Sequence, residues 1–390
     1  MKKSVVIRAP LLTKSGYGVH SRQIFKYLLG RSDLEIYTNP VPWGITPWSV
    51  DASDDNGLVG EVMNRAIANP DGDQKFDYSI QVQLPNEWDA SLAKKNIGVT
   101  AGVETSFANP IWTNVHCSKM DLVIVPSNHT RDSLLKNSVT TTPIKVVPET
   151  YFDELELDHE PMDLGLSTSF NFLAIGVMTG ASPDTDRKNL FYMLKWFLEE
   201  FKDDPDVGLI LKTNRGRETS IDRKVTLKLI RQIMKEVQRT DFPKIHLLHG
   251  VMSRKDMASL YNSNDVKALI SCTRGEGFGL PLIEAAVSGM PVLATNWSAH
   301  KEFLDLGKWI KFEYDLRPIS KERVDGQIFM PGSQWAEVRE QDFKQKIRKF
   351  YKSNQLPQKW AQELSLKIKE KYGWKQIVSA YDQALSEIFV

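Results

Sequence analysis

The part of the chain that most constrains the fold is a glycine-rich segment at residues 275–296, GEGFGLPLIEAAVSGMPVLATN. An apolar run at residues 266–272 leads into its turn, and a second apolar run follows at residues 292–295. Between them, Pro281 suits the start of a helix because its φ is fixed and it has no N–H to donate. A helix over residues 282–288 would end at the glycine and proline that follow it. The segment therefore predicts a strand, a glycine turn, a helix and a second strand.

Two glutamates, Glu276 and Glu284, stand eight residues apart in this segment. We expect Glu276 at the carboxyl end of the first strand and Glu284 in the first turn of the helix. The free N–H groups of the turn and the positive end of the helix favour a phosphate. Ionised carboxylates accept hydrogen bonds from the hydroxyls of a ribose or a hexose. The alternative is an ordinary Rossmann-type turn whose glutamates cap the helix or face solvent, and an isolated glycine turn favours that alternative.

Strand and helix patterns alternate along most of the chain, which predicts parallel sheets covered by helices on both faces. An acidic segment without clear periodicity, residues 153–169, interrupts the series and is the expected linker between two domains. The clearest helix in the first half is expected at residues 20–29, where apolar residues form one stripe. The expected strands are residues 5–8, 35–38, 78–83, 96–101, 122–126, 144–147, 170–177, 207–212, 244–248, 266–272 and 292–295.

The composition is that of a globular protein with more than one core. A chain of 390 residues is too long for one ordinary core and suggests two domains. Lys plus Arg (50) nearly balances Asp plus Glu (49), so the overall charge gives no bias toward nucleic acid. Cys117 and Cys272 are too few for a disulfide framework. With no apolar run near the roughly 20 residues that span a bilayer, and no signal peptide, we expect a cytoplasmic protein; attachment to a membrane surface stays open.

The segment at residues 275–296 resembles the E-x7-E signature of the family 4 (group 1) retaining glycosyltransferases. The similarity extends upstream through residues 249–271 and downstream through residues 297–304, and it covers about residues 170–340. It implies the GT-B fold, an α/β architecture with two Rossmann-like domains whose parallel sheets face each other across a cleft. The C-terminal helix is expected to cross back to the first domain.

The resemblance also implies domain boundaries. Residues 1–160 would form an N-terminal Rossmann-like domain on the acceptor side. Residues 170–372 would form a C-terminal Rossmann-like domain that binds a nucleotide sugar. Residues 374–390, whose apolar positions recur at helical spacing, would be the helix that returns to the first domain.

In this family the two glutamates hold different parts of the donor. Glu284 would hold the nucleotide ribose, and Glu276 would hold the hexose hydroxyls. Backbone N–H groups of the turn would bind the sugar and the diphosphate. The turn residues concerned are Gly277, Phe278, Gly279 and Leu280.

A cationic pair, Arg187 and Lys188, opens the helix expected after residues 170–177. Two cations at a helix N-terminus oppose the helix dipole, by about 0.3–1 kcal/mol each, unless an anion binds there. The resemblance assigns Lys188 to the donor diphosphate, with Arg187 beside it. The arginine more usual in the family is absent, since Gly176 is followed by Val177, and whether Arg187 replaces it stays open.

Lys212 ends the strand at residues 207–212. Because ligands bind outside the carboxyl ends of parallel strands, Lys212 is expected to be a further phosphate contact. A simple charge at the edge of the sheet is the alternative.

The first half offers Gly16 and Gly18, in a loop expected at residues 14–19. A dinucleotide motif fails here because Ser21 occupies the third glycine position and no acidic residue ends the second strand. The resemblance places this loop over the donor phosphates, beside the acceptor pocket. Glu104 stands where many members of the family have a histidine, and it either contacts the sugar or acceptor or caps the following segment.

Asp184 and Asp186 form a D-x-D triplet, which binds a divalent metal in another glycosyltransferase fold. It lies in a polar loop without that fold's context, so we expect no metal. His246 and His249, three apart on one strand, face opposite sides and cannot share a metal.

These features together predict a retaining hexosyltransferase that needs no cofactor. The donor is expected to be a nucleoside-diphosphate sugar of the UDP-glucose or GDP-mannose type. The acceptor is expected to be a sugar, a lipid-linked molecule or another hydroxyl compound. Two alternatives stay open: a non-catalytic protein that binds nucleotide sugars, and a transferase that modifies nucleic acid. The oligomeric state is not predicted.

Overall fold

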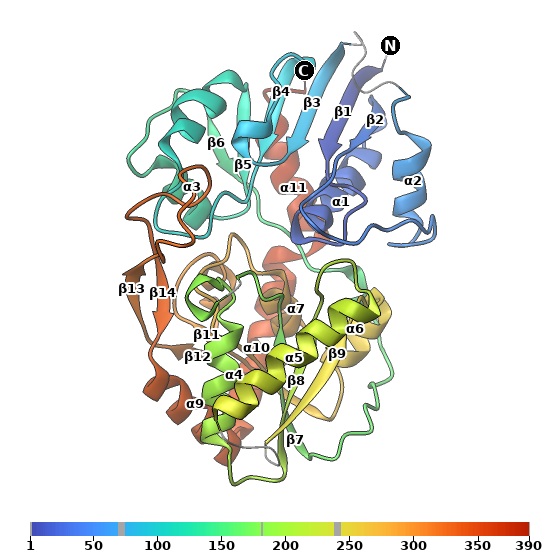
Figure 1. The fold of residues 1–390 in the computed structure, drawn as a ribbon. Coiled ribbons are helices and arrows are strands. Elements are labelled where there is room, and N and C mark those ends of the chain that lie inside the picture. The colour runs from blue at the N-terminus through green and yellow to red at the C-terminus, as the bar shows by residue number, and fades with distance from the viewer. Residues whose placement is uncertain (1, 69–74, 181, 238–242, 390) are drawn as a thin grey trace. The chain divides into compact units, whose positions relative to one another are not determined.

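The computed structural model describes residues 2–68, 75–180, 182–237 and 243–389. The chain divides into two compact units. The first unit comprises Met1–Thr150, Gly326–Met330 and Trp374–Val390, and the second comprises Tyr151–Asp325 and Pro331–Gly373. Each unit has its own six-stranded sheet with helices packed against it (Figure 1).

The sheet of the first unit is parallel throughout, in the order β2-β1-β3-β4-β5-β6. Its central strands are apolar, as the residues Val5 and Ile7 of β1 illustrate by their complete burial. The strands are β1 (Lys3–Ala9), β2 (Leu34–Pro40), β3 (Phe76–Val82), β4 (Ala93–Val99), β5 (Leu122–Val125) and β6 (Ile144–Val146). The helices before residue 150 are α1 (Gly16–Leu29), α2 (Leu58–Asn64) and α3 (Asn128–Leu135).

The last helix, α11 (Trp374–Leu385), belongs to the first unit. Its apolar side chains Ile377, Tyr381 and Leu385 are buried in the same core as β1. The expectation that the C-terminal helix returns to the first domain is therefore confirmed.

The sheet of the second unit is also parallel, in the order β12-β11-β10-β7-β8-β9. A separate antiparallel hairpin, β13 (Tyr314–Pro318) with β14 (Gln334–Val338), accompanies it. The sheet strands are β7 (Phe170–Ile175), β8 (Val207–Thr213), β9 (Lys244–His249), β10 (Val266–Ser271), β11 (Val292–Thr295) and β12 (Ile310–Phe312). The helices are α4 (Leu190–Glu200), α5 (Ser220–Glu236), α6 (Arg254–Tyr261), α7 (Leu280–Val287), α8 (Lys301–Leu304), α9 (Glu340–Lys352) and α10 (Gln355–Tyr372).

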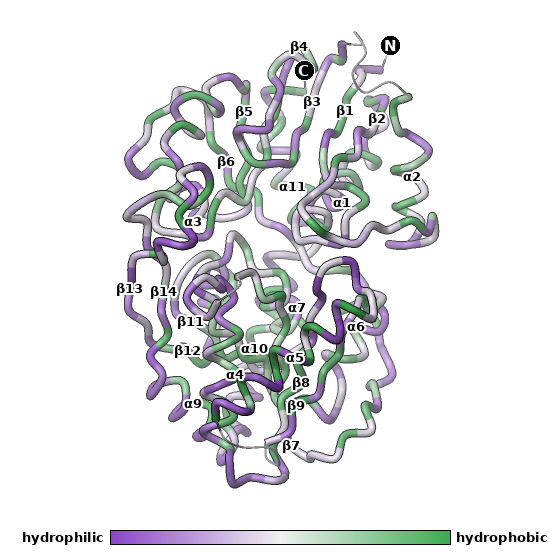
Figure 2. The backbone as a smooth tube through the Cα atoms, in the orientation of Figure 1, coloured by the Kyte–Doolittle hydropathy of each residue, from purple (hydrophilic) through white to green (hydrophobic). Residues whose placement is uncertain are grey.

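Two apolar cores lie on opposite faces of this second sheet. Neighbouring residues of a strand point to opposite faces, so Ile210 joins the core beneath α6, α7 and α10, and Leu209 joins the core beneath α4, α5 and α9. Tyr151 and Leu155 are buried in the first of these cores, so the start of the acidic segment packs on the second unit. Figure 2 shows hydrophobic stretches along strands such as β1 and β8.

The predicted fold class agrees with this architecture, and each of the eleven strands expected from the sequence is present. The loop expected at residues 14–19 is wrong from Gly16 onward, because the Ser15 hydroxyl accepts from the Gly18 N–H and caps α1, which begins at Gly16, four residues before the expected start at residue 20. Among the helices within the described residues, none combines the length and apolar character needed to cross a membrane.

Candidate active site

The turn between β10 and α7 is the centre of the candidate site. Within it, Gly279 adopts a φ of +106°, and a Cβ there would lie 3.2 Å from the Cβ of His300. Only glycine adopts such a backbone conformation without strain, so the turn requires a glycine at this position. The turn brings Glu276 to the carboxyl edge of the sheet and leaves the residue only 7% exposed.

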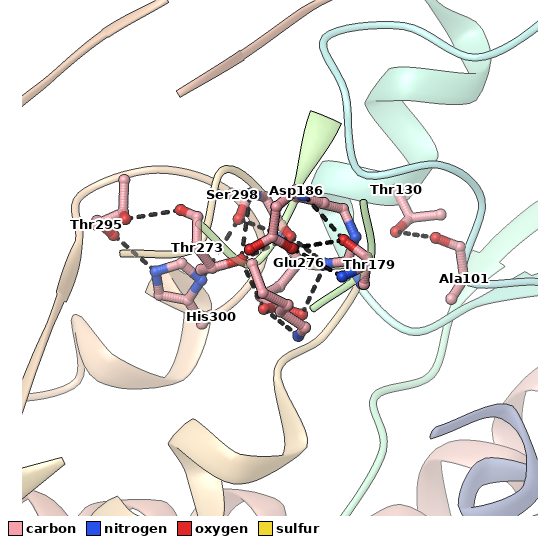
Figure 3. A network of polar contacts seen from close by, with 12 residues as sticks. Ala101, Thr130, Thr179, Asp186, Thr273, Glu276, Thr295, Ser298 and His300 are labelled. Carbon is pink, nitrogen blue, oxygen red and sulfur yellow. Dashed lines mark hydrogen bonds and ion pairs between the residues drawn. The ribbon is translucent and has the colours of Figure 1, made fainter. Parts of the chain in front are cut away.

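The Glu276 carboxylate is bound on both oxygens. Lys188 Nζ lies 2.5 Å from Oε1, and the Thr273 hydroxyl donates to the same oxygen at 2.8 Å. Arg187 contacts Oε2 at 3.4 Å. Burial alone would raise the pKa of Glu276, but the charges of Lys188 and Arg187 and the hydrogen bonds lower it to about 2. Glu276 is therefore ionised at any physiological pH, within the network shown in Figure 3.

Arg187 and Lys188 lie immediately before α4, as the sequence predicted, in a loop that is tied to the glycine turn. The Arg187 guanidinium donates to the Gly275 carbonyl oxygen at 2.6 Å. The start of α4 is capped by Asp186, whose carboxylate accepts from the N–H of Leu190 at 2.8 Å and from the N–H of Thr179 at 2.8 Å. The cap places a negative group at the helix N-terminus, which offsets the unfavourable position of the two cations.

The D-x-D triplet is divided between two structural roles. Asp186 is fully buried as the cap of α4, while the exposed Asp184 accepts a hydrogen bond from the Tyr192 hydroxyl at 3.0 Å. Within the described residues, no group of three or more His, Cys, Asp or Glu side chains is arranged to hold a metal ion. His246 also has a protein partner, since its Nε2 lies 2.8 Å from the Thr168 hydroxyl.

Sequence reasoning missed Arg274, which fixes the loop that carries the cationic pair. The side chain is 1% exposed and donates to the carbonyl oxygens of Pro183 and Asp186 at 2.7 and 2.9 Å. Its backbone N–H donates to the Arg187 carbonyl oxygen at 2.8 Å, and Glu337 on β14 accepts from its Nε at 2.7 Å. The sequence does show an arginine directly before the glycine turn. Its role could not be inferred from that position, because the residues that it binds lie far away in the sequence.

Glu284 is the fifth residue of α7, because the helix begins at Leu280 and not at residue 282. The expected position in the first turn is therefore wrong; Glu284 lies in the second turn. Its carboxylate is partly covered and accepts a hydrogen bond from the Tyr261 hydroxyl at 2.9 Å. Burial raises its pKa to about 7, although the Tyr261 hydrogen bond and the charge of Arg254 act in the opposite direction.

The backbone of the turn offers hydrogen-bond donors at the start of α7. In the part of the chain that the structure describes, the N–H groups of Phe278, Gly279 and Leu280 donate to no protein acceptor, as expected for the first turn of a helix. The Phe278 side chain is buried against the rings of Phe303 and Tyr372, with centroids 5.4 and 6.3 Å away. Phe278 thus anchors the turn through its ring and presents only its backbone.

Lys212 lies near the end of β8, as expected, but its ammonium group is bound by other residues. It is 6% exposed and donates to the Gly250 carbonyl oxygen and, at 3.0 Å, to Asn214 Oδ1. Burial lowers its pKa to about 8. No contact joins it to Glu276 or the cationic pair among the described residues.

The candidates of the first unit lie at the start of α1 and after β4. A Cβ on Gly18 would lie 2.0 Å from the Thr13 carbonyl oxygen, whereas a Cβ on Gly16 would meet nothing within 4 Å. Gly18 is thus required by close packing. Glu104 is partly exposed in the irregular segment after β4. Burial is the main cause that raises the pKa of Tyr17, and the charges of Glu104 and Glu149 act in the same direction, so Glu104 lies close to the start of α1.

Comparison with known families decides what kind of domain surrounds this turn. Residues 231–364 match the family model described as glycosyl transferases group 1. This region is similar to the domain that the group 1 glycosyltransferases share. It includes β10, the glycine turn and both glutamates, so the resemblance seen in the sequence is confirmed. A comparison with curated protein sequences found no match.

Solved glycosyltransferase structures share the GT-B fold with this chain. Sucrose-phosphate synthase from Thermosynechococcus elongatus superposes with a TM-score of 0.65 at 12% identity, covering 100% of this chain and 99% of that one. Anabaena HepE, solved with UDP and glucose, gives 0.61 at 15% identity, with 99% and 100% covered. The pneumococcal O-GlcNAc transferase GtfA, solved with UDP and GlcNAc, gives 0.51 at 17% identity, with 80% of this chain covered. The chain spans only 56% of the length of GtfA.

Proposed function

We propose that the protein is a retaining glycosyltransferase that moves a hexose from a nucleoside-diphosphate sugar to a hydroxyl acceptor. The observation that carries this proposal is the carboxylate of Glu276 held by Lys188 and Arg187 beside a helix start with unpaired N–H groups. Such a site offers positive charge for a diphosphate and a negative acceptor for sugar hydroxyls. The family match over residues 231–364 supports the same chemistry.

Each side chain would have one role. Lys188 and Arg187 would bind the diphosphate and stabilise the charge that develops on it as the glycosidic bond breaks. The N–H groups of Phe278, Gly279 and Leu280 would add hydrogen bonds to the same oxygens. Glu276 would accept from the hexose hydroxyls, and Glu284 would accept from the ribose.

We further propose that the acceptor attacks from the face that the diphosphate leaves, which retains the anomeric configuration. The bond between the anomeric carbon and the diphosphate oxygen breaks, and the acceptor oxygen forms the new bond to that carbon. The acceptor proton passes to the leaving diphosphate. The side chains described above bind and neutralise; none of them is assigned the role of a nucleophile.

The donor is proposed to carry UDP or GDP, and the complexes of HepE and GtfA with UDP support UDP. The acceptor is proposed to be a sugar, a lipid-linked molecule or another hydroxyl compound. The two cysteines, Cys117 and Cys272, are free and buried, which agrees with a cytoplasmic location.

A panel of UDP-hexoses and GDP-hexoses tests the function. We expect one donor to raise the melting temperature and to be slowly hydrolysed, with nuclear magnetic resonance showing that the released sugar first has the donor's anomeric configuration. A donor that binds without hydrolysis or transfer to any acceptor would instead support the non-catalytic alternative. Release of the opposite anomer would exclude retention.

Binding without a divalent metal is a separate prediction. Lys188 and Arg187 supply positive charge, and both aspartates of the D-x-D triplet already have other partners. Affinity for the nucleoside diphosphate, measured by calorimetry, should therefore be the same in EDTA as in Mg²⁺ or Mn²⁺. Binding that disappears in EDTA and returns with metal would contradict this.

A further inference from the structure

A group of buried polar residues, in addition to the cationic pair, surrounds the backbone and carboxylate of Glu276. Thr273 follows β10, Thr295 ends β11, and Ser298 and His300 lie in the turn before α8. Thr273, Thr295 and His300 are fully buried, and Ser298 is 7% exposed. Figure 3 shows them around Glu276. The sequence patterns assigned none of them a role, and the roles proposed above do not use them.

The hydrogen-bond partners of His300 fix which of its nitrogens carries the proton. Its Nε2 lies 2.7 Å from the Thr295 carbonyl oxygen, and a carbonyl only accepts, so Nε2 must be protonated. In a neutral ring Nδ1 is then an acceptor, and the Ser298 hydroxyl, 3.4 Å away, donates to it. The same hydroxyl oxygen accepts from the Glu276 backbone N–H at 2.9 Å. One histidine tautomer thus sets the direction of both bonds.

The other half of the group returns to the Glu276 side chain. The Thr295 hydroxyl donates to the Thr273 carbonyl oxygen at 2.7 Å. The Thr273 hydroxyl donates to Glu276 Oε1 at 2.8 Å. The five hydrogen bonds therefore form a closed ring that holds both the backbone and the carboxylate of Glu276.

The backbone of Ser298 supports a role beyond packing. Its φ is +81°, a left-handed conformation that is strained for a residue with a side chain and persists only where its surroundings hold it. Ser298 is also the residue whose hydroxyl oxygen accepts a hydrogen bond from the Glu276 backbone N–H. Strain of this kind clusters at functional sites.

Charged groups near His300 act in both directions. Burial is the largest influence and lowers the pKa of His300; the charges of Lys188 and Lys301 act in the same direction, while Glu276 and the hydrogen bond to Thr295 oppose them. His300 is therefore neutral at neutral pH. A second proton would turn Nδ1 into a donor and remove the acceptor of the Ser298 hydroxyl.

We propose that His300, neutral with its proton on Nε2, is a positioning residue that holds Glu276 in the orientation needed for sugar transfer. This rests on the proposed contact of Glu276 with the hexose. Among the described residues, the five hydrogen bonds of this ring join only Glu276, Thr273, Thr295, Ser298 and His300, and none of them ends on a group assigned to the nucleotide. Loss of the His300 hydrogen bonds should therefore lower kcat and leave nucleotide affinity intact. A displacement of about 1 Å in such a group costs on the order of 100-fold in rate.

Two substitutions test the role of the His300 side chain. His300→Leu removes both hydrogen-bonding nitrogens, whereas His300→Gln keeps one donor and one acceptor and does not titrate. We expect His300→Leu to lower kcat by roughly 10- to 100-fold, with the dissociation constant of free nucleoside diphosphate changed less than about threefold. His300→Gln should retain more activity than His300→Leu. We expect kcat of the unmodified protein to fall at acidic pH as His300 gains a second proton, and kcat of His300→Gln to lack this fall.

His246→Gln is the matched control, because His246 also hydrogen-bonds a threonine and also has a pKa lowered by burial, but lies on β9 outside the ring. It should keep the pH profile of the unmodified protein. Equal losses in His300→Leu and His300→Gln, or an unchanged kcat in His300→Leu, would overturn the proposal. Nitrogen-15 spectra of the unmodified protein that place the His300 proton on Nδ1 would overturn it independently of activity. If no donor is turned over by the unmodified protein, the proposed function fails instead.

Discussion

At the scale of single residues, the two glutamates of the signature occupy opposite electrostatic environments. Glu276 has a pKa lowered to about 2 by two cations, and Glu284 has a pKa raised to about 7 by burial. One is a permanent anion that compensates Lys188 and Arg187. The other sits near the point where it gains or loses a proton at neutral pH. Their spacing in the sequence assigns both glutamates to one motif but does not predict that their pKa values differ.

Substituting each glutamate with alanine should separate these roles. Glu276→Ala leaves Lys188 and Arg187 without their carboxylate partner, so free nucleoside diphosphate should bind as tightly as before or more tightly, while transfer collapses. Glu284→Ala should weaken the nucleoside diphosphate and the intact donor alike, by roughly 10- to 100-fold, if about 1.5–3 kcal/mol of charged hydrogen bonding is lost. Calorimetry beside a turnover assay measures both. Equal losses of nucleotide affinity in the two variants would contradict the assignment.

The raised pKa of Glu284 gives a pH dependence. Hydroxyls that donate to its carboxylate favour the ionised form, so nucleotide binding should lower this pKa from about 7 and release protons. Affinity should therefore rise as the pH increases from below 7 to above it. Calorimetry near pH 7 in buffers of different ionisation enthalpy measures the release. Glu284→Gln, which cannot ionise, should lose the part of the release that does not come from the nucleotide's own phosphate; an unchanged release would contradict a ribose contact.

At the scale of elements, the start of α1 contains two glycines with different reasons to be glycine. A Cβ on Gly18 would collide with the Thr13 carbonyl oxygen, whereas Gly16 has open space around its Cα. We expect Gly18→Ala to destabilise the first unit, and Gly16→Ala to be neutral or stabilising by up to about 1 kcal/mol because alanine loses less entropy in a helix. Thermal unfolding of both variants measures this. Nucleotide affinity tests the expectation that this loop lies over the donor phosphates. If Gly16→Ala keeps full stability but binds nucleoside diphosphate more weakly, the backbone at Gly16 contacts the phosphates.

Elements with local patterns were predictable, and those defined by distant partners were not. The buried strands β8 and β10 are short apolar runs between turn residues, so periodicity identified them. The hairpin of β13 and β14 was missed, because β13 carries charged and exposed residues such as Arg317 and has no apolar run of its own. Its link to the site, Arg274 to Glu337, joins residues 63 positions apart, and no local pattern contains that information.

The site shows the same division. Glu276, Lys188 and the glycine turn were found because a helix start and its charges are encoded within a few residues. Ser298 and His300 were not assigned a role, because their role depends on hydrogen bonds that form only when the ends of β10 and β11 lie side by side. The helical turn that contains Glu284 was misassigned because the helix begins at Leu280, two residues before its expected start at residue 282.

At the scale of the whole molecule, sequence order and structural units differ. The first unit is completed by α11, which follows the entire second unit in the chain. The helix is held by its buried apolar stripe and by polar contacts: the Tyr381 hydroxyl lies 3.2 Å from His20 Nε2, and Lys145 donates to the Ala384 carbonyl oxygen at 3.1 Å. The stability of the first unit should therefore depend on residues at the far end of the sequence.

Substitutions on the two sides of α11 test this dependence in the full chain. Ile377 is 1% exposed in the core of the first unit, so Ile377→Ala should cost about 2–5 kcal/mol through lost burial and the cavity left behind. Gln376, its exposed neighbour on the same helix, provides the control, and Gln376→Ala should change stability by less than about 0.5 kcal/mol. Hydrogen exchange locates the effect: Ile377→Ala should reduce protection of the amides in β1 and β3 and leave β8 and β10 protected as before. Loss of protection confined to the second unit would mean that α11 stabilises the domain that precedes it in sequence, against the packing observed.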